Sequence, residues 1–338
     1  MISHKQIFEA SERIKRQTVY TPVIQSERLN QMVSAEVFFK CENLQKIGAF
    51  KYRGACNSIL QLTDKQKSQG IIAYSSGNHA QAIALVAKEQ NIKATIVMPN
   101  NAPKIKINST KEHGAEVILF DPQETTREQI AKQVHGYNKL TLIKPFDNEM
   151  VIAGQGTAAL ELLNEINDLD YILAPCGGGG LLSGTAIIAK HLNPKIKVIG
   201  VEPELADDAA RSFYTGILHS NPNPPTIADG TRTTSMGYFT FPLVREFVDE
   251  IVTVSEDSIR RAVAFAFSHF KLVLEPSGAL PIAALLYDIA SVNTDDEPDI
   301  GLKEFKPNGR IGVILSGGNI DPNLMSKILD FNAQFASS

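Results

Sequence analysis

The chain of 338 residues is 43% hydrophobic and 21% charged, with a net charge of −4. This is the composition of a globular protein with a full apolar core, and it lacks the basic stripe that nucleic-acid binding requires. No apolar run is long enough to span a membrane, and the N-terminal MISHKQIFEASERIKR predicts an amphipathic helix rather than a secretory signal. Cys41, Cys56 and Cys176 are scattered and odd in number, which argues against a disulfide framework or zinc site and favours the reducing cytoplasm.

Short β-branched runs alternate with helical patterns along the chain. We expect strands at residues 36–40, 70–74, 94–98, 115–120, 171–174, 196–201, 250–254 and 310–315. We expect helices at residues 78–90, 104–113, 125–137, 151–166, 181–192, 256–270 and 277–290. This alternation predicts an α/β fold, in which helices cover both faces of a mostly parallel sheet and ligands bind at the carboxyl ends of the strands.

Two segments interrupt this alternation. Residues 219–239 are rich in Pro, Gly, Thr and Asn, and a loop of this length is more often functional than decorative. The sequence KPFDN at 144–148 separates two helix–strand series, and we interpret it as a crossing between two domains.

A run of four glycines, Gly177 to Gly180, follows one expected strand and opens a helix in CGGGGLLSG. Such a run lets backbone N–H groups converge on an anion at the positive end of the helix. No GK[ST] sequence follows, and the spacing differs from the dinucleotide fingerprint, so a single phosphate monoester is the expected ligand. A plain tight turn is the structural alternative.

The sequence SSGNHA follows another expected strand, where Ser75 or Ser76 is expected to cap a helix beginning near Asn78. The free N–H groups of that first turn are able to bind a carboxylate, although a simple cap explains the pattern equally well. Lys51 lies between Phe50 and Tyr52, an apolar setting that lowers the pKa of an amine and favours Schiff-base chemistry. By spacing alone, however, a lone lysine is more typical of a solvated surface charge.

Two further motifs complete the set. Ser316 ends the strand RIGVIL, which directs its side chain toward the ligand crevice unless the following glycines form only a turn. Glu202 and Asp208 in VEPELADDA, with a carbonyl between them, are suitable oxygen ligands for a hard cation. A solvated acidic turn is the reading that spacing alone favours.

Together these segments resemble the family of serine racemases and threonine (serine, 3-hydroxyaspartate) dehydratases, which are pyridoxal 5′-phosphate enzymes with the fold of the tryptophan synthase β subunit, fold type II. The resemblance extends from about Ile7 to Pro322, and the motifs occur in the order of the family. We therefore expect a large domain at residues 1–48 and 147–325 that holds the cofactor phosphate and the metal. We expect a small domain at residues 49–146 that holds the substrate carboxylate loop, followed by a C-terminal tail at 326–338.

The resemblance assigns the cofactor site. Lys51 matches the lysine that binds the cofactor as a Schiff base, and Asn78 matches the partner of its phenolic oxygen. The phosphate cradle matches Gly177, Gly178, Gly179, Gly180 and Leu181. Ser316 matches the residue that faces the pyridine nitrogen, where a neutral hydroxyl implies an unprotonated ring and favours α-deprotonation followed by β-elimination.

The resemblance also assigns the substrate and catalytic residues. Ser76 matches the serine that works on the cofactor face opposite Lys51 in serine racemases, so the two residues form an acid–base pair. The substrate is expected to contact the loop residues Ser75, Ser76, Gly77, Asn78 and His79, and also Arg127. The implied activity is racemisation of a small hydroxy amino acid to its enantiomer, or its dehydration by an ammonia-lyase reaction that yields a keto acid and ammonia.

Other ligands and partners are implied in the same way. Glu202, Asp208 and the carbonyl of Ala206 match a divalent-cation site for Mg²⁺, Mn²⁺ or Ca²⁺. Lys46, Gln81 and Asn319 match some positions of a nucleotide effector site, whereas Ile47 and His113 depart from that pattern. A homodimer is expected, with no nucleic-acid or membrane partner.

Two other functions remain open at this point. One is β-replacement of the cysteine or cystathionine synthase type, which the Ser76 and Asn78 pattern and the acidic turn disfavour. The other is a non-catalytic protein that binds the cofactor or an amino acid, which the joint presence of Lys51, Ser76 and Asn78 disfavours.

Overall fold

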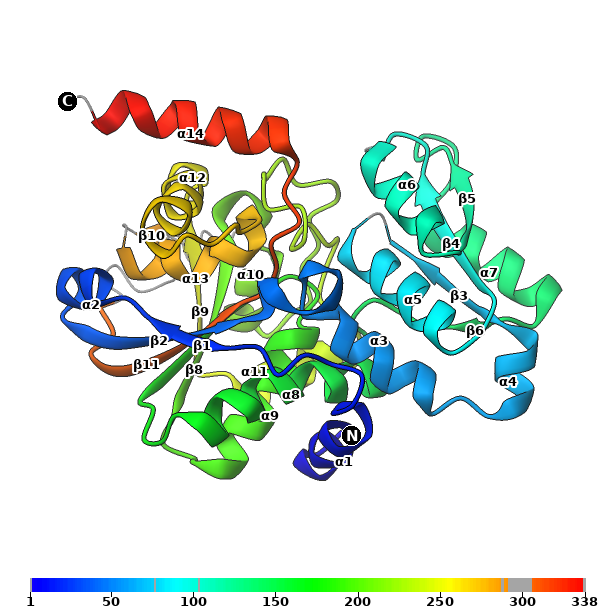
Figure 1. Cartoon of the computed structure of the whole chain (residues 1–338), viewed down its shortest axis with the longest axis horizontal. Helices are drawn as coiled ribbons and strands as arrows, with labels where there is room; N and C mark the ends of the chain where they lie inside the picture. Colours follow the sequence, from blue (N-terminus) through cyan, green and yellow to red (C-terminus); the bar gives the residue numbers. More distant parts are fainter. Residues whose placement is uncertain (1, 76, 103, 287–288, 291–305, 337–338) are drawn as a thin grey trace.

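Two β-sheets organise the computed structural model, which describes residues 2–75, 77–102, 104–286, 289–290 and 306–336. The seven-stranded sheet has the order β1-β2-β11-β7-β8-β9-β10, with β1 (Val23–Gln25), β2 (Ala35–Cys41), β7 (Tyr171–Pro175), β8 (Lys197–Pro203), β9 (Glu250–Val254), β10 (Ile289–Ala290) and β11 (Gly309–Leu315). The four-stranded sheet has the order β5-β4-β3-β6, with β3 (Ile71–Tyr74), β4 (Ala94–Pro99), β5 (Glu116–Phe120) and β6 (Thr141–Leu142). Figure 1 shows the larger sheet on the left and the smaller one on the right.

The inner strands of both sheets pair in parallel, and among the described strands only the edge strands β1 and β10 are antiparallel to their neighbours. The last strand, β11, inserts between β2 and β7, with Val313 opposite Phe39 on one side and Leu173 on the other. This pairing places the residues that follow β2, β7 and β11 at one edge of the sheet, although they are far apart in the sequence.

Helices cover both faces of each sheet, as Val- and Ile-rich parallel strands require. One face of the large sheet packs against α1 (His4–Ile14), α8 (Glu149–Glu165), α9 (Gly180–Leu192), α10 (Asp208–Thr215) and α11 (Thr240–Phe247). The other face packs against α2 (Glu27–Val33), α12 (Glu256–Phe265), α13 (Pro276–Leu286) and α14 (Pro322–Ala336). The small sheet packs against α3 (Lys51–Leu60), α5 (Asn78–Glu89) and α6 (Lys104–Glu112) on one face and α7 (Arg127–Asn138) on the other, and α4 (Asp64–Gln69) precedes β3.

The α/β fold and all the strands expected from the sequence are confirmed, as is the N-terminal amphipathic helix, α1. Most of the expected helices also occur within two residues of their predicted ends. The prediction of one helix over 277–290 is wrong at its end, because α13 stops at Leu286 and residues 289–290 pair with β9. The helix expected at 256–270 changes at Ala266 into a π-helical turn that ends at Phe270.

Residues 219–239 contain no helix or strand within the part of the chain that the structure describes, in agreement with the predicted loop. All strands of the smaller sheet lie within residues 49–146, and the division into domains stays a prediction. Helix α14 continues through the expected start of the C-terminal tail at residue 326, and Ile328 is buried in the apolar cluster to which α12 also contributes.

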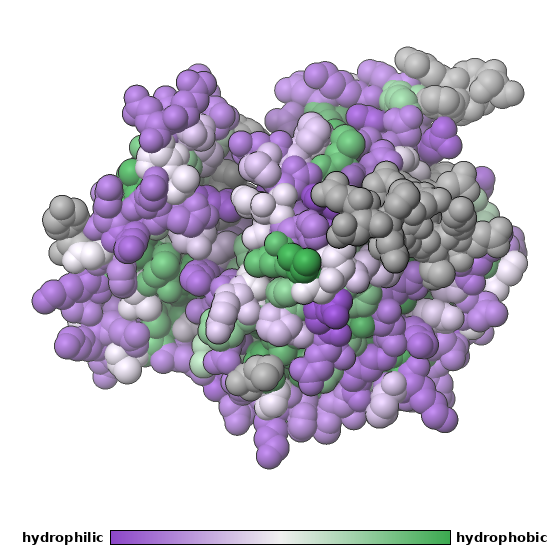
Figure 2. Space-filling view, turned by 180° about the vertical axis from the view of Figure 1, so that it is seen from behind, coloured by the Kyte–Doolittle hydropathy of each residue, from purple (hydrophilic) through white to green (hydrophobic). Residues whose placement is uncertain are grey.

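The surface opposite to the view of Figure 1 is hydrophilic over most of its outer margin, whereas apolar residues gather toward the middle (Figure 2). Large side chains that are exposed include Tyr238, Ile217, Tyr20 and Leu44. Among the described residues, no helix is both long and apolar enough to cross a membrane.

Candidate active site

A cavity of about 980 Å³ lies where the carboxyl ends of strands from both sheets meet. Its lining includes Ser75 after β3, Pro99 at the end of β4, Gly177 after β7 and Ser316 after β11. Parallel sheets leave their crevice at this edge, so the position agrees with the expected ligand site.

Lys51 is the first residue of α3, and the segment after β11 holds it in place. Phe50 N donates to Ser316 O at 3.0 Å, and Ala49 forms an isolated bridge with Gly317. The ammonium of Lys51 donates to Pro145 O at 2.8 Å and lies 5.1 Å from the centre of the Phe50 ring. Burial lowers the pKa of Lys51 to about 8, against the opposing effect of the Glu275 carboxylate. With this pKa, roughly a tenth of the amine is neutral at pH 7, far more than for a lysine at its usual pKa of about 10.4, and the neutral amine is the form that Schiff-base chemistry requires.

The glycine run forms a backbone cradle between β7 and α9. Gly179 has φ +84°, a left-handed conformation that favours glycine, and it is the N-cap of α9. A Cβ atom on Gly177 would lie 2.8 Å from Thr231 Cα, and one on Gly178 would overlap the ring of Phe146. Only glycines therefore allow residues 146 and 231 to approach this loop, and they leave the N–H groups at the start of α9 open to a phosphate. The residues present fit the phosphate of pyridoxal phosphate.

The start of α5 forms the side of the cavity that the small sheet contributes. The N-cap is Gly77, so the expected cap by Ser75 is wrong: Ser75 Oγ instead accepts from Gly77 N at 3.2 Å. Ser76, the predicted partner of Lys51, lies outside the described residues. The first-turn N–H groups of Asn78 and His79 have no acceptor within their own helix and are suited to a carboxylate.

The side chains of Asn78 and His79 both have fixed roles in the packing. Asn78 Nδ2 donates to Glu275 Oε1 at 2.8 Å, and its Oδ1 accepts from Asn319 Nδ2 at 2.9 Å. His79 Nε2 lies 3.1 Å from Ile143 O, and burial lowers the pKa of this imidazole to about 3. His79 is therefore neutral, with Nε2 protonated and donating to the carbonyl.

The cavity brings together all the predicted cofactor and substrate residues that the structure describes: Lys51, Ser75, Gly77, Asn78, His79, Arg127, Gly177, Gly178, Gly179, Gly180, Leu181 and Ser316. The individual roles of these residues stay predictions. The guanidinium of Arg127 pairs with Glu128 at 2.8 Å and lies over the ring of Tyr74.

Sequence reasoning missed several residues that line the same cavity. Glu275 is buried, and this burial, with a contribution from Asp229, raises the pKa of its carboxyl group to about 8. Lys106 forms an ion pair with Asp229. Asp229 belongs to the loop at 219–239 that we expected to be functional, whereas nothing in the sequence around Glu275 or Lys106 indicated a site.

The predicted metal ligands lie outside the cavity, at the end of β8. The side chains of Glu202 and Asp208 are both fully buried, and neither carboxylate oxygen of Asp208 has a partner among the described residues. Glu202 accepts from the amides of Ala209 and Ala210 at 3.3 and 2.9 Å. Burial raises the pKa of Asp208 to about 7 and, together with the charge of Asp208, raises that of Glu202 well above its usual value. The two unused oxygens of the buried Asp208 carboxylate suit a hard divalent cation. Among the described residues, however, no group of three or more His, Cys, Asp or Glu side chains is placed to hold a metal ion.

The residues predicted for a nucleotide also lie outside the cavity lining. Lys46 Nζ pairs with Glu89 at 3.0 Å and donates to Tyr52 Oη at 3.2 Å. Asn319 donates to Ile47 O at 2.6 Å, which places it beside Lys46, and Gln81 accepts from Ser109 Oγ at 3.5 Å. The one cation of this predicted set is thus already balanced by a carboxylate.

A lysine that faces a glycine phosphate cradle across the junction of two α/β sheets is the arrangement of a pyridoxal-phosphate enzyme. Residues 14–299 match the family described as pyridoxal-phosphate dependent enzyme, and the chain belongs to this family.

Curated relatives include the serine racemase of Schizosaccharomyces pombe, with 45% identity over 94% of each chain. They also include the L-threo-3-hydroxyaspartate ammonia-lyase of Saccharomyces cerevisiae, with 45% identity over 93% of this chain and 92% of the relative. Among solved structures, the serine racemase of Dictyostelium discoideum is similar with a TM-score of 0.85 and 42% identity, covering 95% of this chain and 99% of that one.

Proposed function

We propose that this protein is a pyridoxal-phosphate-dependent enzyme that racemises or dehydrates small hydroxy amino acids: serine, threonine or 3-hydroxyaspartate. The observation that carries the proposal is the single cavity in which Lys51, the glycine cradle, Ser316 and the start of α5 face one another. The relatives that are named serine racemases and hydroxyaspartate ammonia-lyases support the same choice of reaction.

The residues of this chain divide the work of binding and proton transfer. The N–H groups at the start of α9 hold the cofactor phosphate, and those of Asn78 and His79 hold the substrate carboxylate. The cofactor, when bound, supplies an electron-withdrawing ring that stabilises the charge left on Cα. Lys51, as a neutral amine, removes the proton from Cα, which its pKa of about 8 permits. Ser316 is a buried hydroxyl and adds no charge beside the ring.

Two outcomes follow from loss of the same proton. If the β-hydroxyl leaves as water, the product after hydrolysis is a keto acid with ammonia. If a proton returns to Cα from the face opposite Lys51, the product is the enantiomer, and we propose Ser76 as the donor. A mixed racemase and ammonia-lyase activity is therefore expected.

A product assay over serine, threonine and 3-hydroxyaspartate in both configurations tests the proposal. We expect keto acid and ammonia from at least one substrate, the opposite enantiomer from the same or another, and neither product with Lys51→Ala. If the wild-type holoenzyme leaves all these substrates unchanged, or if Lys51→Ala retains full turnover, the proposal is wrong.

A Ser76→Ala variant tests the second proton donor. We expect it to lose racemisation while keeping part of the elimination from the L-enantiomer, because elimination needs only the base on the Lys51 face. Parallel loss of both activities would instead assign Ser76 to substrate binding or cofactor geometry.

The two alternative functions make different predictions. A β-replacement enzyme would consume O-acetylserine and sulfide and form cysteine. A non-catalytic binding protein would bind the cofactor or an amino acid with no product. The same assay, run with these additions, separates all three.

We also propose a divalent cation at Glu202, Asp208 and the Ala206 carbonyl, on the strength of the unpartnered oxygens of Asp208. Because Glu202, Ala206 and Asp208 do not line the cavity, we propose that the cation orders the end of β8 and takes no part in the reaction. Addition of EDTA with no change in melting temperature or activity would contradict this site.

A homodimer in the cytoplasm is our proposal for the assembled state. Exposed Tyr20 and Leu44 are available for an interface, and the three cysteines are free and buried, which suits a reducing compartment. A nucleotide effector at Lys46, Gln81 and Asn319 stays a proposal as well, and it would have to compete with Glu89 for Lys46. Sedimentation with and without ATP measures both the assembly and this effect.

A further inference from the structure

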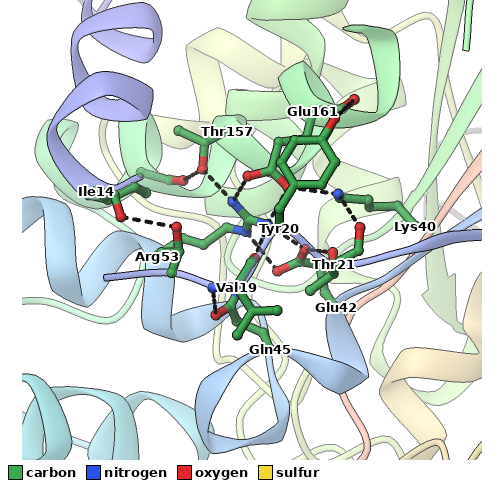
Figure 3. Close-up of polar contacts among 12 residues, drawn as sticks. Ile14, Val19, Tyr20, Thr21, Lys40, Glu42, Gln45, Arg53, Thr157 and Glu161 are labelled. Carbon is green, nitrogen blue, oxygen red and sulfur yellow. Dashed lines mark hydrogen bonds and ion pairs between the residues drawn. The ribbon is translucent and has the colours of Figure 1, made fainter. Parts of the chain in front are cut away.

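A buried arginine follows Lys51 by two residues on the same helix. The side chain of Arg53 has 0% exposure. Residues two apart on an α-helix project about 200° from each other, so Arg53 leaves α3 on the side opposite to Lys51. Figure 3 shows its guanidinium enclosed by side chains from α8, from the end of β2 and the turn after it, and from the segment that precedes β1. Whatever fixes this guanidinium therefore also fixes the turn of helix that carries Lys51.

Every N–H group of the guanidinium has an acceptor. Glu42 receives two hydrogen bonds, from Nε at 2.7 Å and from Nη2 at 2.8 Å. Glu161 receives two more, from Nη1 and Nη2, both at 2.7 Å. Thr157 Oγ1 accepts the fifth, from Nη1 at 3.2 Å. An arginine has five such donors, and forked contacts to two carboxylates define its orientation in a way that a single ion pair does not.

The charges of the cluster balance within the buried region. Lys40 pairs with Glu161 at 2.7 Å and donates to Thr21 O at 2.6 Å, while Thr21 Oγ1 donates to Glu42 at 2.6 Å. Arg53 and Lys40 thus offset Glu42 and Glu161. Buried ion pairs of this kind often add little net stability compared with an apolar core, because desolvation offsets the attraction. What the cluster supplies is one defined geometry.

The partners of Arg53 come from elements on which the cofactor site is built. Glu42 follows β2, the neighbour of β11 in the large sheet, and Glu161 and Thr157 lie on α8. Helix α8 approaches α3 closely, since a Cβ atom on Gly154 would lie 2.6 Å from Arg53 O. Helix α8 also approaches α9, since a Cβ atom on Gly184 would lie 2.7 Å from Gly156 N. The helix of the lysine and the helix of the phosphate cradle are therefore both packed directly on α8.

We propose that Arg53 is a positioning residue that fixes the Lys51 amine relative to the Gly177–Gly180 phosphate cradle, through its forked contacts to Glu42 and Glu161. The inference rests on the proposed function, in which Lys51 bonds the aldehyde of the cofactor while the cradle holds its phosphate. A two-point attachment of this kind requires that the distance between the two points be constant, and Arg53 and α8 together set that distance.

Binding of two forms of the cofactor to the apoprotein separates positioning from general destabilisation. Pyridoxal 5′-phosphate uses both points, whereas pyridoxine 5′-phosphate carries an alcohol in place of the aldehyde and uses only the cradle. In Arg53→Lys, which keeps the charge but lacks the fork, we expect pyridoxal phosphate to bind about tenfold more weakly, equivalent to about 1.4 kcal/mol. We expect the dissociation constant of pyridoxine phosphate to stay at the wild-type value.

Two further variants complete the experiment. Arg310→Lys makes the same substitution at the amino end of β11, where Arg310 pairs with Glu36 at 3.2 Å far from the cavity, and it is expected to change neither constant. Glu161→Gln removes one charge from the cluster at a side chain that is 12% exposed, and it is expected to act in the same direction as Arg53→Lys if the latter does not fold.

Parallel weakening of both ligands, or unchanged binding of both in a folded variant, would overturn the inference. The result does not depend on turnover. Wild-type protein that binds both ligands but converts no hydroxy amino acid would refute the proposed reaction and leave the role of Arg53 intact.

Discussion

A methyl group added at Gly154 provides a direct test of the packing that joins α3 to α8. In Gly154→Ala, the new Cβ atom would lie 2.6 Å from both Arg53 O and Gly54 Cα and 2.9 Å from Arg53 C. All three are backbone atoms that cannot turn aside, so α3 has to move away from α8. Overpacking of this kind lowers the free energy of unfolding by about 3 kcal/mol, the upper end of the usual range. Replacing glycine by alanine inside a helix raises it by about 1 kcal/mol through helix propensity. We expect Gly154→Ala to lower the free energy of unfolding by about 2 kcal/mol.

Gly136→Ala is the matched control. Gly136 also lies inside a helix, α7, but a Cβ atom there has nothing within 4 Å. Only the propensity gain applies, so this variant is expected to be more stable than wild type by about 1 kcal/mol. Urea unfolding followed by circular dichroism measures both, and the difference of about 3 kcal/mol corresponds to roughly two decades in the unfolding constant. If the two alanine variants are equally stable, the close approach of α3 and α8 is not present in solution.

Three other predictions concern the site itself. The rate at which the apoprotein captures pyridoxal phosphate should rise with pH up to about 8 and then level off, because only the neutral amine of Lys51 reacts; a rate that is constant across this range would contradict its lowered pKa. Without a divalent cation, the melting temperature should fall as pH rises from about 4 to about 7. The pKa of the buried Asp208 is raised to about 7 in the folded protein, so ionisation of this carboxyl group destabilises the folded state, and added Mg²⁺ should abolish the fall. Arg232, a cavity residue with no ion-pair partner in the described part of the chain, is expected to bind a second carboxylate. Arg232→Met should therefore raise KM for 3-hydroxyaspartate about tenfold and leave KM for serine unchanged, whereas equal changes for both substrates would exclude this role.

Eight strands could be predicted because most of them are short, buried, apolar runs that end at a glycine, proline or polar residue. Strands β1, β6 and β10 were not predicted, because they are only two or three residues long. The glycine cradle could also be predicted, because four consecutive glycines between a strand and a helix have few structural uses. The end of α13 was not predictable in this way. The apolar pattern continues past Leu286, and pairing of residues 289–290 with β9, a tertiary contact, takes over from the helix.

The side chains around the cavity show where local reasoning fails. Spacing alone predicts that Lys51 is a solvated surface charge. In the structure Lys51 is instead half-buried beside Pro145, Ser316 and Glu275, which are distant in the sequence. Ser75 looked like a helix cap, but the chain turns through Gly77 before α5 begins. The contact between Ser316 and Phe50 depends on the insertion of β11 between β2 and β7, which no local pattern encodes.

The sequence by itself determined the alternation of strands and helices, the cradle that only glycines allow, and the family to which these motifs belong. The tertiary structure decided that the helices carrying Lys51 and the cradle both pack on α8. It also decided that Arg53 lies in a buried charge cluster and that the carboxylate oxygens of Asp208 have no hydrogen-bond partner among the described residues. The physical reason is that propensity and pattern act over a few residues. Burial, the pKa of an amine and the balance of buried charges depend instead on which distant segments share a volume from which water is excluded.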